Sequence, residues 1–345
     1  MKSMRCLPCP ALGVRVLGAA AALFSWFACA NLSEAAVEIT HSDGFTWCTV
    51  GNPGNPDFIG LDAEFTKVRL GGVDHAFRIT RTEVTSDVFF EFLSAYTPHI
   101  PPSEWHFYET DTGSISYLGG RLVLFPSLGK LPADGSWRTA ARFCNWLHNN
   151  RSSEAWSFET GAYDTSTFGQ VPGHPGEYTD ATTHMPGARF WIPTLDEWMK
   201  AAHYDPDRYG LGAEGYWLYP HSSDSPPVGG APGTGADANI DTDAMWNVGS
   251  YPAVLSPYGL LDTAGSLSEW TETDSYRGRR WYRGNDFIGR SFGTQLDNIV
   301  GYYTGTSPDN HDAFGFRIAT TVPSPAAAPG MVLLLSSPLL RRRQQ

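Results

Sequence analysis

The cysteines have the widest chemistry of any side chains in this sequence, because a thiolate can bind a soft metal, act as a nucleophile or close a disulfide. Three of the five, Cys6, Cys9 and Cys29, lie close to the N-terminus. Cys144 falls on the apolar face of a predicted helix, which favours a packing role. Two thiols often pair where a protein is exported. The sequence leaves open whether Cys48 and Cys144 form a disulfide or remain two free thiols.

Aromatic side chains between the predicted elements form a second group that could bind a ligand. They are Tyr216, Trp217, Tyr219, Trp246, Trp281 and Tyr282. Flat aromatic faces beside carboxylates are suited to holding a sugar or a peptide. The alternative interpretation is that these rings are exposed without a ligand.

Other catalytic patterns are sparse. The ten histidines show no His-Glu-x-x-His spacing, and no phosphate-binding loop follows a predicted strand. The 36 acidic residues against 24 Lys and Arg give a formal charge of −12. An acidic chain repels phosphate backbones and anionic lipid, so the charge argues against nucleic-acid binding and against charge-driven membrane binding.

Three amphipathic helices are predicted to position these groups, after Thr85, after Ser136 and from Thr194. Their apolar faces follow the helical spacing: Phe89, Phe92, Leu93 and Tyr96; Ala140, Phe143, Cys144 and Leu147; Leu195, Trp198, Ala201 and Ala202. The third helix begins with a capping box, in which Thr194 and Glu197 each satisfy a backbone N–H of the first turn.

The rest of the chain predicts short strands and long loops. Strands are expected at Ala76–Ile79, Phe190–Ile192 and Phe314–Thr320. Segments rich in Gly, Pro, Asp and Ser run over Ser152–Gly187 and Tyr219–Asp243, and long polar segments of this kind usually carry function. Few helices, short strands and long ordered loops predict an irregular, loop-rich α+β domain.

The N-terminus is expected to direct export. Residues 1–36 combine a basic start, an apolar run over Val16–Phe27, and small residues before Ala30 and Ala36. This pattern is typical of a secretory signal peptide. Cleavage would remove three of the cysteines and leave Cys48 and Cys144.

The C-terminus, residues 322–345, has three parts: a proline motif at Pro323–Pro325, an apolar stretch over Ala326–Leu340, and the basic cluster Arg341–Arg343. This order resembles the PEP-CTERM sorting tail of bacterial exported proteins, in which the family has Glu where Ser324 stands. The resemblance implies an exosortase-type processing enzyme as a partner and transient membrane contact through the tail. It also implies a location at the cell surface, outside the cell or in the outer envelope.

Five ordered blocks resemble the formylglycine-generating enzyme (sulfatase-modifying factor) domain. They are Phe77–Leu93, Ala141–Leu147, Trp191–Trp198, Tyr258–Trp270 and Gly315–Ala319. The resemblance, together with Val50–Asn55, suggests the exported, PEP-CTERM-tailed branch of this family. It implies a C-type-lectin-like, loop-rich α+β fold over residues 37–321, with these tryptophans in the core: Trp137, Trp146, Trp191, Trp198 and Trp270.

The oxidase of that family binds copper(I) through two cysteines shortly after an Arg-Gly-Gly-Ser turn. Here the turn reads Arg283-Gly284-Asn285-Asp286-Phe287, and residues 288–302 contain no cysteine. The sequence therefore predicts neither copper nor the catalytic residues of the oxidase.

The family also holds structural calcium on oxygen ligands. Its Ala-Asn-Ile segment has a counterpart in Ala238-Asn239-Ile240, with Asp241 and Asp243 nearby. Its Gly-Asn-x-Trp-Glu-Trp segment corresponds to Gly265–Trp270, where Ser266 replaces Asn and Glu269 is kept. The resemblance thus implies a calcium site at Asn239, Ile240, Asp241, Asp243 and Glu269, because oxygen-rich loops suit a hard cation. A solvated Asp/Asn turn is the alternative.

Two functions follow from these observations. The first is an exported or cell-surface binding or structural module that lacks the oxidase centre and takes a peptide or glycan ligand. The second is an enzyme of the oxidase family that acts on proteins or peptides through a centre that the sequence does not reveal.

Overall fold

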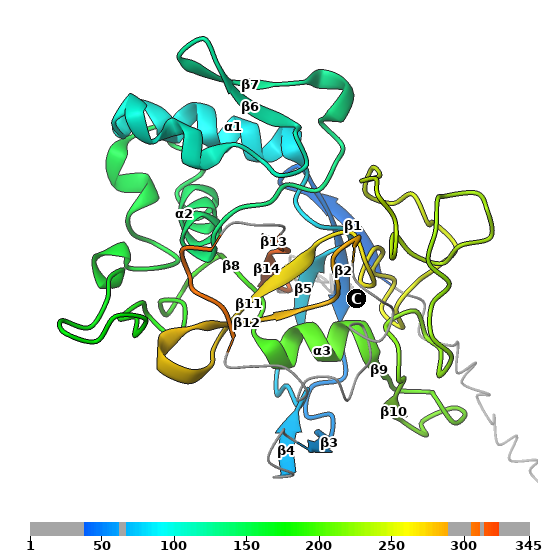
Figure 1. The fold of residues 1–345 in the computed structure, drawn as a ribbon. Helices are drawn as coiled ribbons and strands as arrows, with labels where there is room; N and C mark the ends of the chain where they lie inside the picture. The colour runs from blue at the N-terminus through cyan, green and yellow to red at the C-terminus, as the bar shows by residue number, and fades with distance from the viewer. Residues whose placement is uncertain (1–37, 62–66, 289–304, 311–313, 324–345) are drawn as a thin grey trace, which may run out of the picture. The chain divides into compact units, whose positions relative to one another are not determined.

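The computed structural model describes residues 38–61, 67–288, 305–310 and 314–323 (Figure 1). The predicted signal peptide, nearly all of the predicted sorting tail and most of residues 288–302 lie outside these ranges. A search of the described helices for a membrane span finds none that is both long and apolar enough.

A five-stranded antiparallel sheet organises the domain (Figure 1). Its order is β1 (Ile39–Ser42), β2 (Phe45–Val50), β5 (Phe77–Thr80), β14 (Ala319–Thr321) and β8 (Phe190–Trp191). The last strand of the described chain thus lies between two strands from its first and middle parts. The strands predicted near residues 76 and 190 are confirmed.

The third predicted strand, Phe314–Thr320, is wrong as one element. Phe314–Gly315 forms β13, which pairs in parallel with β11 (Ser268–Asp274), whereas β14 pairs with β5 and β8. The chain passes from one sheet to the other between these pairings. Arg317 lies at this crossing, and its side chain is fully buried.

The smaller sheets lie in the connections. β12 (Arg280–Arg283), β11 and β13 form a three-stranded sheet. The remaining strands form two-stranded pairs: β3 (Phe58–Leu61) with β4 (Lys67–Leu70), β6 (Ile115–Leu118) with β7 (Arg121–Leu124), and β9 (Tyr204–Asp205) with β10 (Gly215–Tyr216).

All three predicted helices are confirmed: α1 (Ser86–Tyr96), α2 (Trp137–His148) and α3 (Leu195–His203). The capping box of α3 is present, with Thr194 Oγ1 accepting from the Glu197 N–H at 3.1 Å. Short 3₁₀ helices occupy the connections: η1 (Thr97–His99), η2 (Pro102–Tyr108), η3 (Pro126–Leu128), η4 (Ala155–Phe158), η5 (Thr165–Thr167) and η6 (Tyr276–Gly278).

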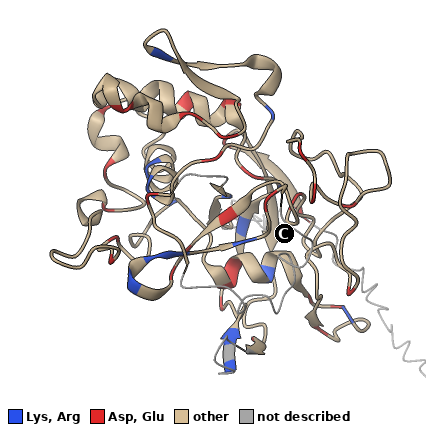
Figure 2. Ribbon diagram, viewed as in Figure 1, with Lys and Arg blue, Asp and Glu red and all other residues tan. Residues whose placement is uncertain are grey.

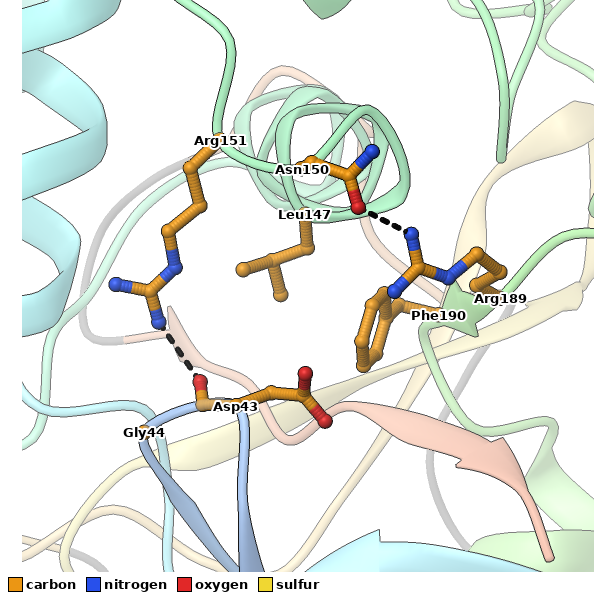
Figure 3. A pocket seen from close by; sticks show the side chains of 7 residues that line it. All are labelled: Asp43, Gly44, Leu147, Asn150, Arg151, Arg189 and Phe190. Carbon is orange, nitrogen blue, oxygen red and sulfur yellow. Dashed lines mark hydrogen bonds between the residues drawn. The ribbon is translucent and has the colours of Figure 1, made fainter. Parts of the chain in front are cut away.

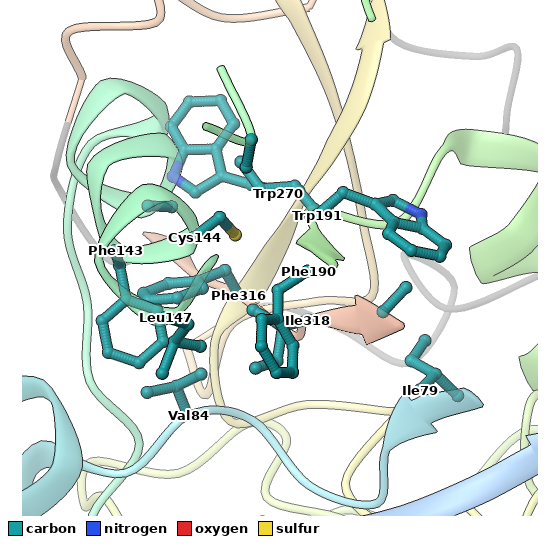
Figure 4. Close-up of a cluster of buried hydrophobic side chains, with 14 of the residues drawn as sticks. Ile79, Val84, Phe143, Cys144, Leu147, Phe190, Trp191, Trp270, Phe316 and Ile318 are labelled. Atoms are coloured by element: carbon teal, nitrogen blue, oxygen red, sulfur yellow. The ribbon is translucent and has the colours of Figure 1, made fainter. Parts of the chain in front are cut away.

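The core forms where α1 and α2 pack on the five-stranded sheet. Phe143 of α2 lies 5.4 Å, centroid to centroid, from Phe316 and 5.5 Å from Phe92 of α1. Figure 4 shows Cys144 and Leu147 within this cluster. The five tryptophans predicted for the core are all buried. The mixed, loop-rich α+β fold predicted from the sequence is therefore confirmed.

Candidate functional site

A cleft of about 320 Å³ opens beside the first hairpin of the sheet. Its walls come from the β1–β2 hairpin, from the connection between β5 and α1, and from three residues of later loops, Lys130, Val248 and Leu261. The volume lies in the range of small-molecule sites, which start at about 300 Å³.

Glu83, in the connection between β5 and α1, lines this cleft although its side chain is almost fully buried. One carboxyl oxygen, Oε1, accepts a 3.4 Å hydrogen bond from the Leu267 N–H. The other, Oε2, has no hydrogen-bond partner among the described residues. Burial, reinforced by the neighbouring Glu269 and Asp262 carboxylates, raises the pKa of Glu83 well above its ordinary value. The raised pKa favours the protonated acid, whose hydroxyl can donate a hydrogen bond.

Glu269 has more hydrogen-bond donors than Glu83. Arg317 Nε donates to both oxygens of Glu269, at 2.9 and 2.8 Å, and Trp198 Nε1 donates at 2.7 Å. Two donors, one of them charged, make three hydrogen bonds that favour the ionised form of Glu269 against the burial that raises its pKa. Within the described chain the nearby Glu83 has only one weak backbone donor. Burial therefore raises the pKa of Glu83 with fewer opposing hydrogen bonds than at Glu269.

Arg317 also fixes the floor of the cleft. Its Nη1 donates to the carbonyl oxygens of Thr80 and Arg81 at 3.2 and 2.6 Å, and its Nη2 donates to that of Leu261 at 2.5 Å. Together with the pair to Glu269, these bonds tie the end of β5 to β11 and to the loop at Leu261. The buried ion pair is therefore a structural clamp beneath the cleft.

Two positive side chains, those of Arg81 and Lys130, line the cleft. Arg81 donates through Nε to the Gly259 carbonyl at 3.1 Å, and Lys130 pairs with Asp87 at 2.6 Å. The two cations present hydrogen-bond donors to the cleft. This arrangement suits a ligand rich in oxygen acceptors.

The structure places the residues of the predicted calcium site in different surroundings. Asn239 is buried, and its Oδ1 accepts from Thr242 Oγ1 at 2.6 Å. Ile240 is buried with Ala238 and Ala264. Asp241 and Asp243 are exposed.

Glu269 is engaged by Arg317 and Trp198 rather than by the Asn239 loop. The two segments are joined through the backbone, where the Ser266 N–H donates to the Asn239 carbonyl at 3.0 Å. No group of three or more His, Cys, Asp or Glu that could hold a metal occurs in the described residues. The calcium site stays a prediction.

The two cysteines of the described chain are free thiols and fully buried. Burial raises the pKa of Cys48 to about 11 and that of Cys144 well above its ordinary value. A copper(I) site needs accessible thiolates. Neither cysteine fits that ion.

Arg283 ends β12 opposite Glu269, and its guanidinium lies 5.7 Å from the centroid of the Trp198 ring. Figure 2 shows the acidic strand β11 beside the basic strand β12. Residues 289–304 lie outside the described ranges. The sequence at residues 289–293 is Gly-Arg-Ser-Phe-Gly, which fits the Gly-x-Ser-x-Gly pattern of serine hydrolases by residue type.

The aromatic residues predicted as ligand contacts are partly used by the fold. Trp217 donates to Asp205 Oδ2 at 2.9 Å, and the Arg208 guanidinium covers its ring at 4.3 Å from the centroid. Trp281 packs against the apolar face of α3. Glu83 and Arg317 were not predicted as site residues. The sequence signal that could have found them is their position: each is a charged residue among apolar residues within a family block, Glu83 in Phe77–Leu93 and Arg317 in Gly315–Ala319.

Comparison with known proteins identifies one family for this chain. No curated protein matches the chain. Among solved structures, CarF is 20% identical, with 81% of this chain and 99% of CarF covered and a TM-score of 0.46. PvdO from Pseudomonas aeruginosa is 15% identical, with 83% and 98% covered and a TM-score of 0.46. The model of the sulfatase-modifying factor enzyme 1-like domain matches residues 62–322. The chain therefore belongs to the sulfatase-modifying factor family.

Proposed function

We propose that this chain is a binding module of the sulfatase-modifying factor family and not a formylglycine-generating oxidase. The burial of both cysteines in the described residues carries the proposal. A thiol with no access to solvent and a raised pKa provides no thiolate for copper(I) or for a substrate peptide. The sequence supports this, because residues 288–302 contain no cysteine.

The test is oxygen consumption with a cysteine-containing sulfatase peptide and copper(I). We expect no conversion of the peptide cysteine above a control without protein, and no stoichiometric copper after desalting. The Cys48→Ser variant should behave like the parent. Copper-dependent turnover by the parent that this variant loses would overturn the proposal.

We place the ligand of this module in the cleft at Glu83. The guanidinium of Arg81 offers donors to a peptide or glycan, and the raised pKa of Glu83 favours an acid that can also donate. An array of peptides and glycans should give binding that Arg81→Gln weakens. Arg121→Gln serves as the matched control, because Arg121 is exposed on β7 away from the cleft. Equal binding by parent and Arg81→Gln would contradict this placement.

A second candidate function, acid–base catalysis on a peptide, is favoured by one pair of residues. The His184 Nδ1 and Glu272 Oε1 atoms lie 2.9 Å apart, and Tyr163 OH donates to the same oxygen at 2.8 Å. Burial opposes protonation of His184, but the hydrogen bond to Glu272 raises its pKa. A partly exposed imidazole held by a buried carboxylate is a common acid–base arrangement.

Mass spectrometry of a peptide pool tests this second function. A product that the parent forms should disappear with His184→Asn and persist with His174→Asn, whose side chain is 62% exposed. No product from the parent, or equal product from both variants, would reject it.

We also propose that the protein is exported and belongs to the PEP-CTERM-tailed branch of the family. The support is the order of parts at the two ends of the sequence. An exosortase-type enzyme would then process the tail, whose apolar stretch of about 15 residues is short for a membrane-spanning helix, which needs about 20. Changing Arg341, Arg342 and Arg343 to Ser should release more protein to the medium. Retention equal to the parent would contradict the tail assignment.

Calcium remains a proposal for the loop at Asn239. A ligand that binds only the folded state stabilises it by about 2.7 kcal/mol at 100 times its dissociation constant. Millimolar calcium should therefore raise the melting temperature relative to chelator, and Asn239→Ala should lose this response. Identical melting in calcium and chelator would reject the site.

A further inference from the structure

A second hollow, of about 310 Å³, lies at the C-terminal end of α2. The charged residues that line it differ from those of the cleft at Glu83. Three segments far apart in the sequence build it (Figure 3). They are the β1–β2 turn at Asp43 and Gly44, the end of α2 from Leu147 to Arg151, and Arg189–Phe190 at β8. We call it the arginine pocket.

Arg151 forms one wall of the arginine pocket and is already neutralised. Its Nη1 donates to Glu91 Oε2 at 2.7 Å, and its Nη2 donates to the Asp43 carbonyl at 2.8 Å. Its guanidinium also lies 5.1 Å from the centroid of a Trp146 ring. A Cβ at Gly44 would lie 3.0 Å from Arg151 Nη2, and Gly44 has a φ of +82°. Glycine therefore permits this close approach, and Arg151 serves as a fixed wall.

Arg189 stands on the opposite side and keeps its charge. Its Nη1 donates to the His148 carbonyl at 3.1 Å and to Asn150 Oδ1 at 2.6 Å, both neutral acceptors. Among the described residues no carboxylate pairs with it. A guanidinium has five N–H donors, so the remaining ones can bind a carboxylate in a forked geometry. Figure 3 shows Asn150 and Arg189 joined on one side of the pocket.

Asp43 supplies the complementary charge. Figure 3 shows its carboxylate at the floor of the view, between Arg151 and Arg189. Its carboxylate forms no ion pair within the described chain, and its backbone has a φ of +55°. The apolar lining comes from Leu147 and Phe190, each 3% exposed.

The charges select the ligand. Glu91 cancels Arg151, which leaves one cation, Arg189, and one anion, Asp43, facing the hollow. A dianion such as phosphate is repelled by Asp43, and a simple amine is repelled by Arg189. A ligand that carries one carboxylate, one ammonium and an apolar part satisfies both charges and the apolar lining.

We propose that the arginine pocket binds a free α-amino acid with an apolar side chain. The carboxylate of the ligand pairs with Arg189, its ammonium group with Asp43, and its side chain packs on Leu147 and Phe190. Nothing in this site depends on the ligand of the Glu83 cleft.

The test is isothermal titration of the full chain with L-leucine. Two analogues isolate the charged groups: 4-methylpentanoate lacks the amine, and 3-methylbutylamine lacks the carboxylate. We expect L-leucine to bind at millimolar concentration or tighter and each analogue to bind at least tenfold more weakly. Absence of L-leucine binding, or equal affinity for 4-methylpentanoate, would overturn the proposal.

Variants locate the site. Arg189→Gln and Asp43→Asn should each weaken L-leucine binding at least tenfold, while Arg121→Gln leaves it unchanged. Asp43→Asn should also remove the preference for L-leucine over 4-methylpentanoate, an effect that a general loss of structure does not produce. Binding that both site variants retain at parental affinity places the ligand elsewhere and rejects the pocket. A circular-dichroism melt of each variant confirms that it is folded.

Discussion

The Glu83 cleft and the arginine pocket share Gly44 and have similar volumes, yet they use charge in opposite ways. Beneath the cleft, charges are buried: Arg317 and Glu269 pair out of contact with water, and burial raises the pKa of Glu83. In the arginine pocket, Arg189 and Asp43 are exposed. The comparison teaches that burial, more than residue type, decides whether a charged side chain stabilises the fold or remains available to a ligand.

Energetics follow the same division. Removing one partner of a buried ion pair leaves the other charge uncompensated, which costs about 3–5 kcal/mol, whereas an exposed pair contributes about 0–1 kcal/mol. Variants at the clamp should therefore act on stability, and variants in the arginine pocket should act on binding. The four predictions below test this division.

The largest effect is expected at Arg317. Arg317→Met should lower the free energy of unfolding by about 3–5 kcal/mol, because Glu269 stays buried without its cation. Urea denaturation measures the loss, with Arg121→Met as the exposed control. A loss no greater than that of the control would show that the ion pair does not clamp the sheets.

The next effect is expected at Trp198, which is 1% exposed and donates to Glu269. Trp198→Ala should cost about 3–5 kcal/mol through the lost packing. Thr194→Ala, which removes only the cap of the same helix, should cost about 1 kcal/mol. Denaturant melts compare the two variants, and equal small losses would contradict the burial of Trp198.

Glu83 should give a pH-dependent effect. Its folded pKa is raised above the ordinary value of 4.5, so above pH 4.5 the folded state holds a proton that the unfolded state has lost. Stability therefore falls as pH rises through this window, by at most about 1.4 kcal/mol per pH unit from this group.

Glu83→Gln cannot titrate, so it should gain stability relative to the parent as pH rises from about 5 to about 8. Urea melts at several pH values measure the difference in the free energy of unfolding between this variant and the parent. The titrations of other groups are common to both proteins and cancel in this difference. A difference that does not change with pH would mean that Glu83 is ionised in the folded protein.

The smallest effect on stability is expected in the arginine pocket. Arg189→Gln should change the free energy of unfolding by no more than about 0.5 kcal/mol, because the side chain is exposed and its partners are neutral. The same variant should lose L-leucine affinity. A large stability loss in a urea melt would instead make Arg189 a clamp between α2 and β8, and the contrast between the two sites would fail.

Several parts of this structure could be predicted from the sequence because they depend on neighbouring residues. Helical spacing predicts α1, α2 and α3, and the capping box fixes the start of α3. The position of Cys144 on an apolar helix face predicts its burial. The split of Phe314–Thr320 into two strands could not be predicted, since it depends on which distant strands the two halves pair with.

The sites were decided by the tertiary structure. Glu269 is predicted as a metal ligand from its motif, but its actual partner, Arg317, comes from a different block of the chain. The raised pKa of Glu83 depends on burial and on the neighbouring carboxylates, and neither is visible in local spacing. The arginine pocket likewise needs Asp43 and Arg189, which only the folding of α2 against the sheet brings together. Local periodicity determines elements, because it acts over a few residues. Protonation and ligand binding depend on which remote charges share a low-dielectric environment or a common hollow.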